Sequence, residues 1–146
     1  MSGVSLGPWA AKVFKETGRE LVLALEQRTY LTLLFPFTES SQFRLDFASA
    51  LTSGLLDLGI PGTIARTEAA AIEFEPLCRL TDADFRERLD DVEFFCGIEF
   101  PYHDDLRVIQ RNLNDIPHPN RDPCTPVDGV RRLFIDAPIG LVFVTQ

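Results

Sequence analysis

The residue types best suited to chemistry gather between positions 103 and 124. His103, Asp104 and Asp105 place an imidazole beside two carboxylates, the groups used in divalent-metal sites and in acid–base catalysis. Adjacent residues rarely converge on one ion, so a site would need ligands from the following loop, which offers His118, Asp122 and Cys124. We favour helix capping by Asp104 or Asp105 and predict no metal. His103, Asp104, Asp105 and His118 remain the candidates for catalysis.

A second set of polar side chains follows directly. Arg107, Arg111 and Asn114 recur at i, i+4 and i+7, which places them on one side of a helix, with Asp115 beside them. Guanidinium groups offer forked donors to a carboxylate or phosphate, and an amide adds directional hydrogen bonds. These four residues are therefore candidate ligand-binding residues. Salt bridges to nearby acids, or hydrogen bonds to the backbone at the helix end, are the structural alternatives.

The element that must position these groups runs from Leu106 to Ile116. Its apolar residues follow a helical spacing of i, i+3, i+7 and i+10: Leu106, Ile109, Leu113 and Ile116. This side is expected to face the core. The arginines and Asn114 are then expected to face solvent.

The N-terminal third predicts an antiparallel meander. Segments Trp9–Lys15 and Arg19–Leu25 flank a turn that contains Gly18, which indicates a hairpin. Thr29–Phe35 is rich in strand-forming residues and predicts a third strand. The run LVLAL is apolar at every position, so we expect a central strand covered on both faces by helices or by a partner subunit.

Helices and further strands are expected after the meander. A helix capped by Ser41 is predicted to Leu58, followed by a shorter one over Thr63–Ala71. A third helix opens at Thr81–Asp84, with Phe85, Leu89 and Val92 facing inward. Strands are expected at Ile72–Leu80, Glu93–Phe100, Leu133–Asp136 and Leu141–Thr145, and a proline-rich surface loop at Pro117–Gly129. The fold class is thus α+β, a mainly antiparallel sheet with two to four helices packed on it.

Composition narrows the functional classes. With 146 residues, 45% of them hydrophobic, the chain has the size of a single domain. Its net charge of -8 repels phosphate backbones and anionic membranes, so we expect no nucleic acid and no membrane as partners. The apolar run 21–37 is interrupted by Glu26 and Arg28, which argues against a membrane span.

Three widely spaced cysteines, with no CxxC pair and no secretory leader, favour a cytoplasmic location. Cys78 and Cys96 have apolar neighbours and are expected to be buried, whereas Cys124 lies in the proline-rich loop and is expected to be accessible. The sequence contains no GxSxG elbow, no Walker loop and no GxGxxG, and we predict no cofactor. Cys124 and His118 lack an orienting context for nucleophilic catalysis.

The order of several short motifs resembles an uncharacterised family of small bacterial domains. The matching pieces are Trp9-Ala-Ala-Lys-Val, Arg19-Glu-Leu-Val-Leu, Arg28-Thr29, the helix end Leu58-Gly59-Ile60-Pro61, and Arg107 to Asp115. The resemblance covers most of 9–116 and departs from the family at Gln110–Asn112, where relatives tend to have Leu-Gly-Ser, and at Pro117, where relatives continue the helix. It implies a fold and leaves the activity open.

Two functions from different classes follow. The first is a non-enzymatic binding or protein-interaction domain, with a second copy or another protein as its partner, because no catalytic constellation converges and one strand is apolar on both faces. The alternative is a small metal-dependent or acid–base hydrolase in which His103, Asp104 or Asp105 act with His118. In that case Arg107 and Arg111 would hold an anionic substrate.

Overall fold

A three-stranded antiparallel sheet with the order β1-β2-β3 forms the centre of the chain. The computed structural model describes residues 6–74, 82–119 and 121–136. β1 (Trp9–Glu16) pairs with β2 (Arg19–Glu26), and β2 pairs with β3 (Thr32–Pro36). Thr17 and Gly18 connect β1 to β2 with φ angles of 51° and 81°, the left-handed pair typical of a tight hairpin. The predicted meander is confirmed.

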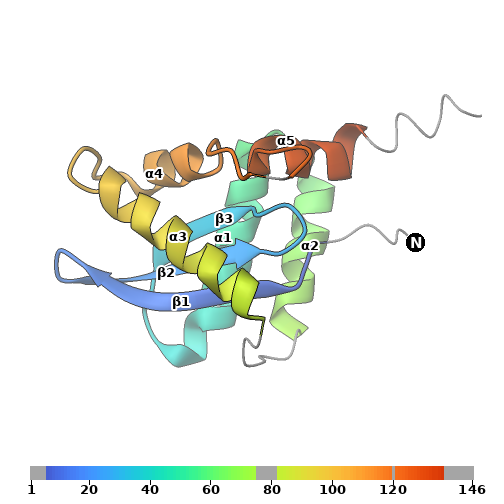
Figure 1. Cartoon of the computed structure of the whole chain (residues 1–146). Coiled ribbons are helices and arrows are strands. Elements are labelled where there is room, and N and C mark those ends of the chain that lie inside the picture. The colour runs from blue at the N-terminus through green and yellow to red at the C-terminus, as the bar shows by residue number, and fades with distance from the viewer. Residues whose placement is uncertain (1–5, 75–81, 120, 137–146) are drawn as a thin grey trace, which may run out of the picture.

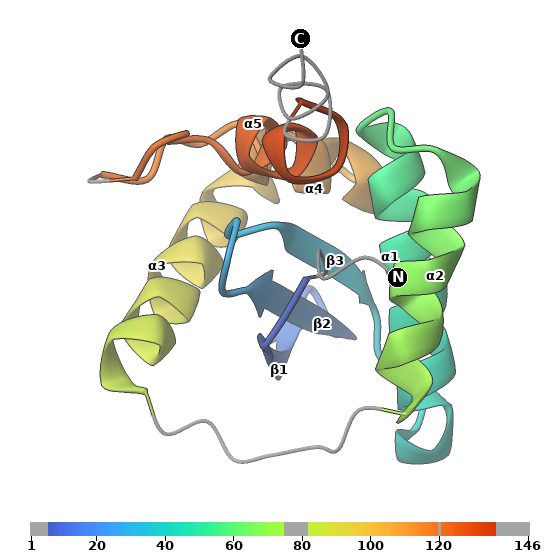
Figure 2. The same ribbon diagram turned by 90° about the vertical axis from the view of Figure 1, so that its right-hand side faces the viewer.

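Helices cover both faces of this sheet and one of its edges. Figures 1 and 2 show α1 and α2 on one face, α3 crossing the other, and α4 beside β3 with α5 near it. Their bounds are α1 Phe43–Asp57, α2 Gly62–Phe74, α3 Ala83–Glu99, α4 Leu106–Leu113 and α5 Pro126–Arg131, with a 3₁₀ turn at Ser40–Gln42 and a π-helical turn at Arg132–Asp136. The α+β fold class is confirmed.

β2 is buried on both faces, as its unbroken apolar run predicts. Leu21, Leu23 and Leu25 pack against α3 and α4, in a cluster that includes Phe85, Leu89, Val92, Cys96, Ile109 and Leu113. Val22 and Ala24 point to the opposite face and pack with residues of α1 and α2. Alternation along one strand therefore divides the core into two apolar layers. Helices of this same chain cover both faces of β2.

Side-chain amides of α4 satisfy the outer edge of β3. The Thr32 N–H donates to Asn114 Oδ1 at 2.8 Å, and Asn114 Nδ2 donates to the Thr32 carbonyl at 3.0 Å. One turn earlier, Gln110 Oε1 accepts the Leu34 N–H at 2.8 Å. An uncovered edge strand would leave these backbone groups without partners. Helix α4 thus takes the place of a fourth strand.

The expectation that Asn114 faces solvent is wrong. Its side chain is 2% exposed because α4 ends at Leu113 and the capping residue Asn114, four residues after Gln110, lies toward β3. Arg107 and Arg111 are exposed, as predicted. The apolar side of α4 faces the core through Ile109 and Leu113.

The predicted cap of α4 is confirmed, whereas the predicted cap of α1 is wrong. Helix α3 begins within the predicted Thr81–Asp84 segment, with Asp82 as its cap. Asp82 accepts the Phe85 N–H at 3.1 Å at the start of α3, and Asp105 accepts the Arg107 N–H at 2.9 Å at the start of α4. Ser41 is not a cap, because it falls inside the 3₁₀ turn. Gln42 occupies the capping position of α1 without a side-chain hydrogen bond.

The strand predicted at Glu93–Phe100 is wrong, because α3 continues to Glu99. Leu89, Val92 and Cys96 are buried at helical spacing, and they extend the inward face of α3 beyond the point where the aromatic residues suggested a strand. Burial of one side is therefore enough to keep this segment helical.

Helices also replace strands elsewhere. Ile72 to Phe74 close α2, and the π-helical turn contains Leu133–Asp136, since Val130 and Phe134 are buried on one side. α5 begins inside the predicted proline loop, with Pro126 at its first turn and Thr125 as its cap. Three predictions fall on residues outside the described part of the chain. They are the rest of the strand predicted at Ile72–Leu80, the burial of Cys78 and the strand predicted at Leu141–Thr145.

Replacement of Asn114 by alanine should be costly. Asn114→Ala leaves the buried N–H and carbonyl of Thr32 without partners, and we expect the free energy of unfolding to fall by about 2–4 kcal/mol. Gln110→Ala, which deprives only the Leu34 N–H, should cost less. The control is Asn112→Ala, whose half-buried amide bonds to Glu99. Urea denaturation measures all three, and equal losses for Asn112 and Asn114 would contradict the role given to α4.

Candidate functional site

The structure places the candidate catalytic residues in different surroundings. His103 follows α3, with Nε2 3.6 Å from the Glu99 carboxylate, while Asp104 is exposed and Asp105 caps α4. His118 is buried against the ring of Tyr30. Within the described residues, no group of three or more His, Cys, Asp or Glu side chains could hold a metal ion.

The four candidate ligand-binding residues also separate. Arg107 Nη2 lies 2.6 Å from Asp57 Oδ1 of α1, and its side chain is 67% exposed. Ion pairs this exposed contribute at most about 1 kcal/mol. Arg111 and Asp115 are exposed, whereas Asn114 is bound to the backbone of β3. Asn114 therefore has a structural role.

Sequence reasoning missed a buried carboxylate that organises the turn between β2 and β3. Glu26 is fully buried, and its Oε2 accepts the N–H groups of Gly7 and Arg28 at 2.7 and 3.0 Å. Its Oε1 accepts both the N–H and the hydroxyl of Thr29, each at 2.7 Å. Four donors offset the desolvation of this charge. The signal in the sequence is a glutamate that directly follows the apolar run Leu21 to Leu25.

Tyr30, in the same turn, is the centre of a cluster of rings and cations. Its φ of 64° is left-handed, a conformation that is uncommon for a residue with a side chain. The Arg121 guanidinium lies 4.0 Å from the ring centroid, and Phe85 stacks with its centroid at 6.5 Å. His118 packs edge-on at 4.7 Å. The Arg121 guanidinium also donates to the Arg28 carbonyl, which ties the 117–125 loop to this turn.

His118 is held in its neutral form by this cluster. Burial first, and then the charges of Arg88 and Arg121, lower the pKa of His118 from 6.5 to about 4. The unfolded chain therefore takes up a proton as the pH falls below 6.5, whereas the folded chain does so only near pH 4. The contribution of neutral His118 to the free energy of unfolding is therefore fully present above pH 6.5 and is lost as the pH falls from 6.5 to about 4.

A pH series should reveal this linkage. Between pH 7 and pH 4, the contribution of His118 to the free energy of unfolding should fall by roughly 3 kcal/mol, on top of the titration of the carboxylates. His118→Phe should remove this contribution, while Leu56→Ser, a change at an exposed residue that carries no ionisable group, should retain the wild-type dependence. Urea denaturation at several pH values measures the difference, and superimposable profiles for wild type and His118→Phe would contradict it.

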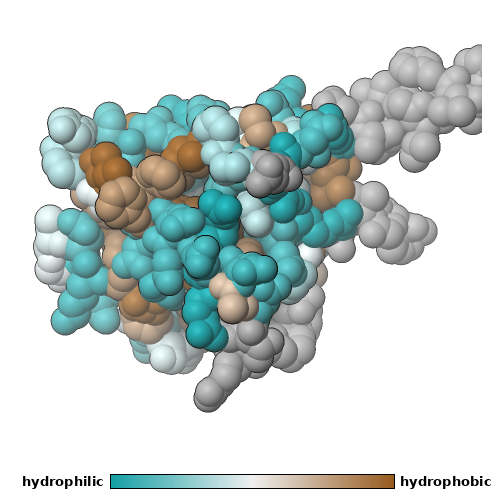
Figure 3. Space-filling view, viewed as in Figure 1, coloured by the Kyte–Doolittle hydropathy of each residue, from teal (hydrophilic) through white to brown (hydrophobic). Residues whose placement is uncertain are grey.

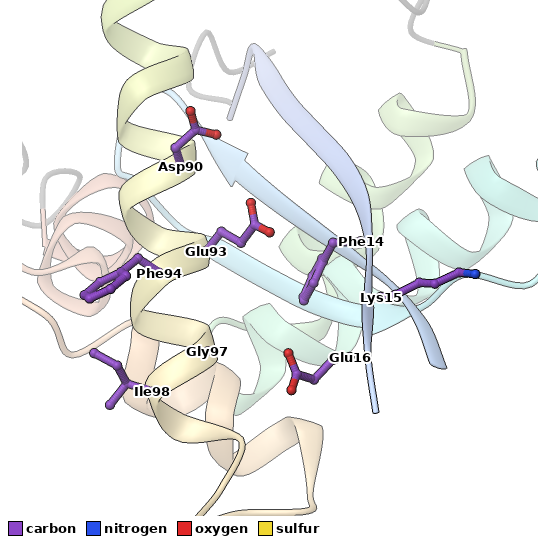
Figure 4. Close-up of a pocket in the computed structure, with 8 residues that line it drawn as sticks. All are labelled: Phe14, Lys15, Glu16, Asp90, Glu93, Phe94, Gly97 and Ile98. Carbon is purple, nitrogen blue, oxygen red and sulfur yellow. The ribbon is translucent and has the colours of Figure 1, made fainter. Parts of the chain in front are cut away.

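An open groove of about 530 Å³ lies between β1 and α3. Its lining consists of Phe14, Lys15 and Glu16 from β1 and of Asp90, Glu93, Phe94, Gly97 and Ile98 from α3. Figure 4 shows Phe14 and Glu16 directed toward α3, and Lys15 directed away from it. Lys12 bridges the two elements, with Nζ 3.1 Å from Asp90 and 2.5 Å from Glu93, and its hydrogen bond to Glu93 raises the pKa of Lys12.

Beside this groove, α3 presents a second apolar face. Phe94 and Ile98, one turn apart on α3, are 68% and 48% exposed, and Tyr102, in the turn that follows the helix, is 79% exposed. We name these three residues the α3 ridge. Phe95 lies next to Phe94 in an edge-to-face contact with centroids 5.9 Å apart. Figure 3 shows hydrophobic side chains gathered over the C-terminal half of α3, with hydrophilic residues around them. Helix α3 is thus apolar toward the sheet and again toward solvent.

Gly97 lies in the last turns of α3, beside the ridge. A Cβ built on Gly97 meets no atom within 4 Å, so no contact inside the described chain requires a glycine there. Gly54 of α1 is different, because a Cβ would come 2.8 Å from the buried Leu33 side chain and 3.2 Å from Gln110. A helix-interior glycine without a packing reason costs stability.

These two glycines should therefore respond in opposite directions. Gly97→Ala should raise the free energy of unfolding by about 0.5–1 kcal/mol, because alanine restricts the unfolded chain and meets open space in the helix. Gly54→Ala should lower it, since the new methyl crowds Leu33. Thermal or urea denaturation checks both. A destabilised Gly97→Ala would show that a neighbour of Gly97 needs this space.

Comparisons with protein-family models, with curated proteins and with solved structures found no match to this chain. In the described part of the chain, no helix combines the length and the apolarity needed to cross a bilayer. Of the places described above, the groove and the α3 ridge are the ones that leave large apolar side chains accessible.

Proposed function

We propose that this chain is a non-enzymatic protein-interaction domain whose binding site is the β1–α3 groove together with the α3 ridge. The supporting observation is that α3 has apolar faces on both sides, and the described chain covers one of them. Single exposed hydrophobic residues are ordinary on protein surfaces. A contiguous set on a helix and the turn that follows it, rimmed by charges, is typical of a protein-binding surface.

The residue types support this proposal. The ridge and Phe95 consist of three aromatic residues and an isoleucine, and aromatic residues are enriched in interface centres. Leu89, Val92 and Cys96 pack α3 against the sheet, so the helix that carries Phe94 and Ile98 is positioned before a partner arrives. A hydrolase would need its acid and base groups to converge, whereas His103 contacts Glu99 and His118 contacts Tyr30.

Site-specific photo-cross-linking tests the proposal in the cell. The photoreactive residue benzoylphenylalanine replaces Phe95, where it preserves an aromatic side chain beside the ridge. The control carries the same residue in place of Leu56, an exposed leucine of α1 on the other side of the sheet. We expect a discrete cross-linked protein band from position 95 that is absent at position 56.

A second substitution makes this result specific to the ridge. Ile98→Ser, added to the chain with the cross-linker at position 95, removes the central apolar side chain of the ridge and should abolish the band. Equal cross-linking at positions 95 and 56, or a band that Ile98→Ser leaves unchanged, would contradict the proposed function.

A further inference from the structure

We propose that the partner bound at the β1–α3 groove is a cationic amphipathic segment of another protein, whose apolar side chains cover Gly97 and the α3 ridge and whose Lys or Arg side chains reach Glu16, Asp90 and Glu93. This inference rests on the proposed function and adds the chemistry of the partner. It is carried by the charges that rim the groove and by the glycine at its wall.

The rim of the groove is acidic. Glu16, Asp90 and Glu93 line it, and Lys12 is shared between the last two, while the Lys15 side chain points away from α3. Among the described residues, Glu16 has no ion-pair partner. The groove therefore has an apolar floor, an unpaired carboxylate on β1 and two carboxylates on α3 that share a single lysine. This arrangement is complementary to a ligand that carries positive charge next to apolar side chains.

The buried thiol of Cys96 responds to the same charges. Cys96 faces the sheet from α3, and its pKa is raised to about 12 by burial first and then by the carboxylates of Glu16, Glu93 and Glu99. Of these three carboxylates, Glu16 of β1 and Glu93 of α3 line the groove, one on each side of it. Their combined field attracts a cation and repels an anion.

The absence of a side chain at Gly97 allows a partner to approach the backbone of α3 closely. Phe94 and Ile98 are exposed on either side of Gly97 in the sequence, and the space above it is open. A helix or extended segment laid across this point can touch the backbone of α3, as small residues allow at close helix crossings. The stability lost to a helix-interior glycine is then offset in the complex.

A second copy of this chain fits the surface less well. Each copy has a net charge of -8, and two acidic rims brought together would repel each other. A basic partner gains from both the apolar and the charged parts of the site. Within α3, Phe94 and Ile98 are separated by about 6 Å of helical rise, and Tyr102 lies in the turn that follows Glu99, so one to two turns of a partner helix would cover the helical part of the ridge.

Fluorescence anisotropy with designed peptides tests this inference on the full chain. The probe is a labelled amphipathic peptide of about fourteen residues made of Leu and Lys, and its counterpart has Glu in place of every Lys. We expect the Lys peptide to bind at least about tenfold more tightly than the Glu peptide. Its binding should weaken severalfold when the salt concentration rises from about 0.05 M to about 0.5 M.

Variants locate the binding. Gly97→Leu should weaken the Lys peptide about tenfold or more by filling the groove, and Gly97→Ala should weaken it less while stabilising the fold. Glu16→Gln should weaken it severalfold, whereas Glu39→Gln, the same charge change in the exposed loop before α1, should leave it unchanged.

Three results would overturn the inference: equal binding of both peptides, no binding of either, or equal effects of Glu16→Gln and Glu39→Gln. If cross-linking at position 95 still depends on Ile98 in those cases, the interaction function stands and only the charge of the partner is wrong. Light scattering provides the remaining test. A dimer that Gly97→Leu dissociates would identify the partner as a second copy and would also overturn the inference.

Discussion

The hydrogen bonds between the amides of α4 and the edge of β3 are the constraint on which the architecture depends. A sheet of three strands has two edges, and each edge presents backbone groups that need partners. At β3, Asn114 pairs with the N–H and the carbonyl of Thr32, much as a residue of a neighbouring strand would. Gln110 repeats part of this pattern at Leu34. The edge of β3 is therefore capped at Thr32 and Leu34 by side chains in place of a further strand.

This closure determines where the accessible surface lies. Helices α1 and α2 cover one face, α3 covers the other, and α4 with α5 occupies the side of β3. β1 is the remaining edge, and it borders α3 through the Lys12 bridge to Asp90 and Glu93. The groove that we propose as a binding site lies at this border. Its position thus follows from the closure of the opposite edge.

Much of the fold can be predicted from the sequence because its periodicity is strong. The unbroken apolar run Leu21 to Leu25 indicates a central strand, and the hairpin signal at Gly18 fixes how it pairs with β1. The C-terminal half of α3 misleads because Phe94, Phe95 and Ile98 add apolar residues to a helix that already has an inward face. A segment that is apolar on both sides loses its helical period, and strand propensity then decides the prediction.

The candidate site is harder to predict because its parts are distant in the sequence. Asn114 is polar and near a helix end, so nothing local shows that its partner is Thr32, 82 residues earlier. His118 follows a proline, and only the tertiary structure brings Tyr30, Arg88 and Arg121 around it. Glu16 and Glu93 likewise meet across the groove only when the hairpin and α3 are packed together.

Cys96 of α3 is buried against the sheet, so its reactivity reports whether α3 stays packed on the sheet. Thiolate formation at this position is strongly disfavoured, and the sulfur is shielded from solvent, whereas Cys124 is exposed. An alkylating reagent therefore reaches Cys96 when α3 separates from the sheet. The rate of that reaction measures how often the helix opens, and a bound partner that clamps α3 in place would slow it.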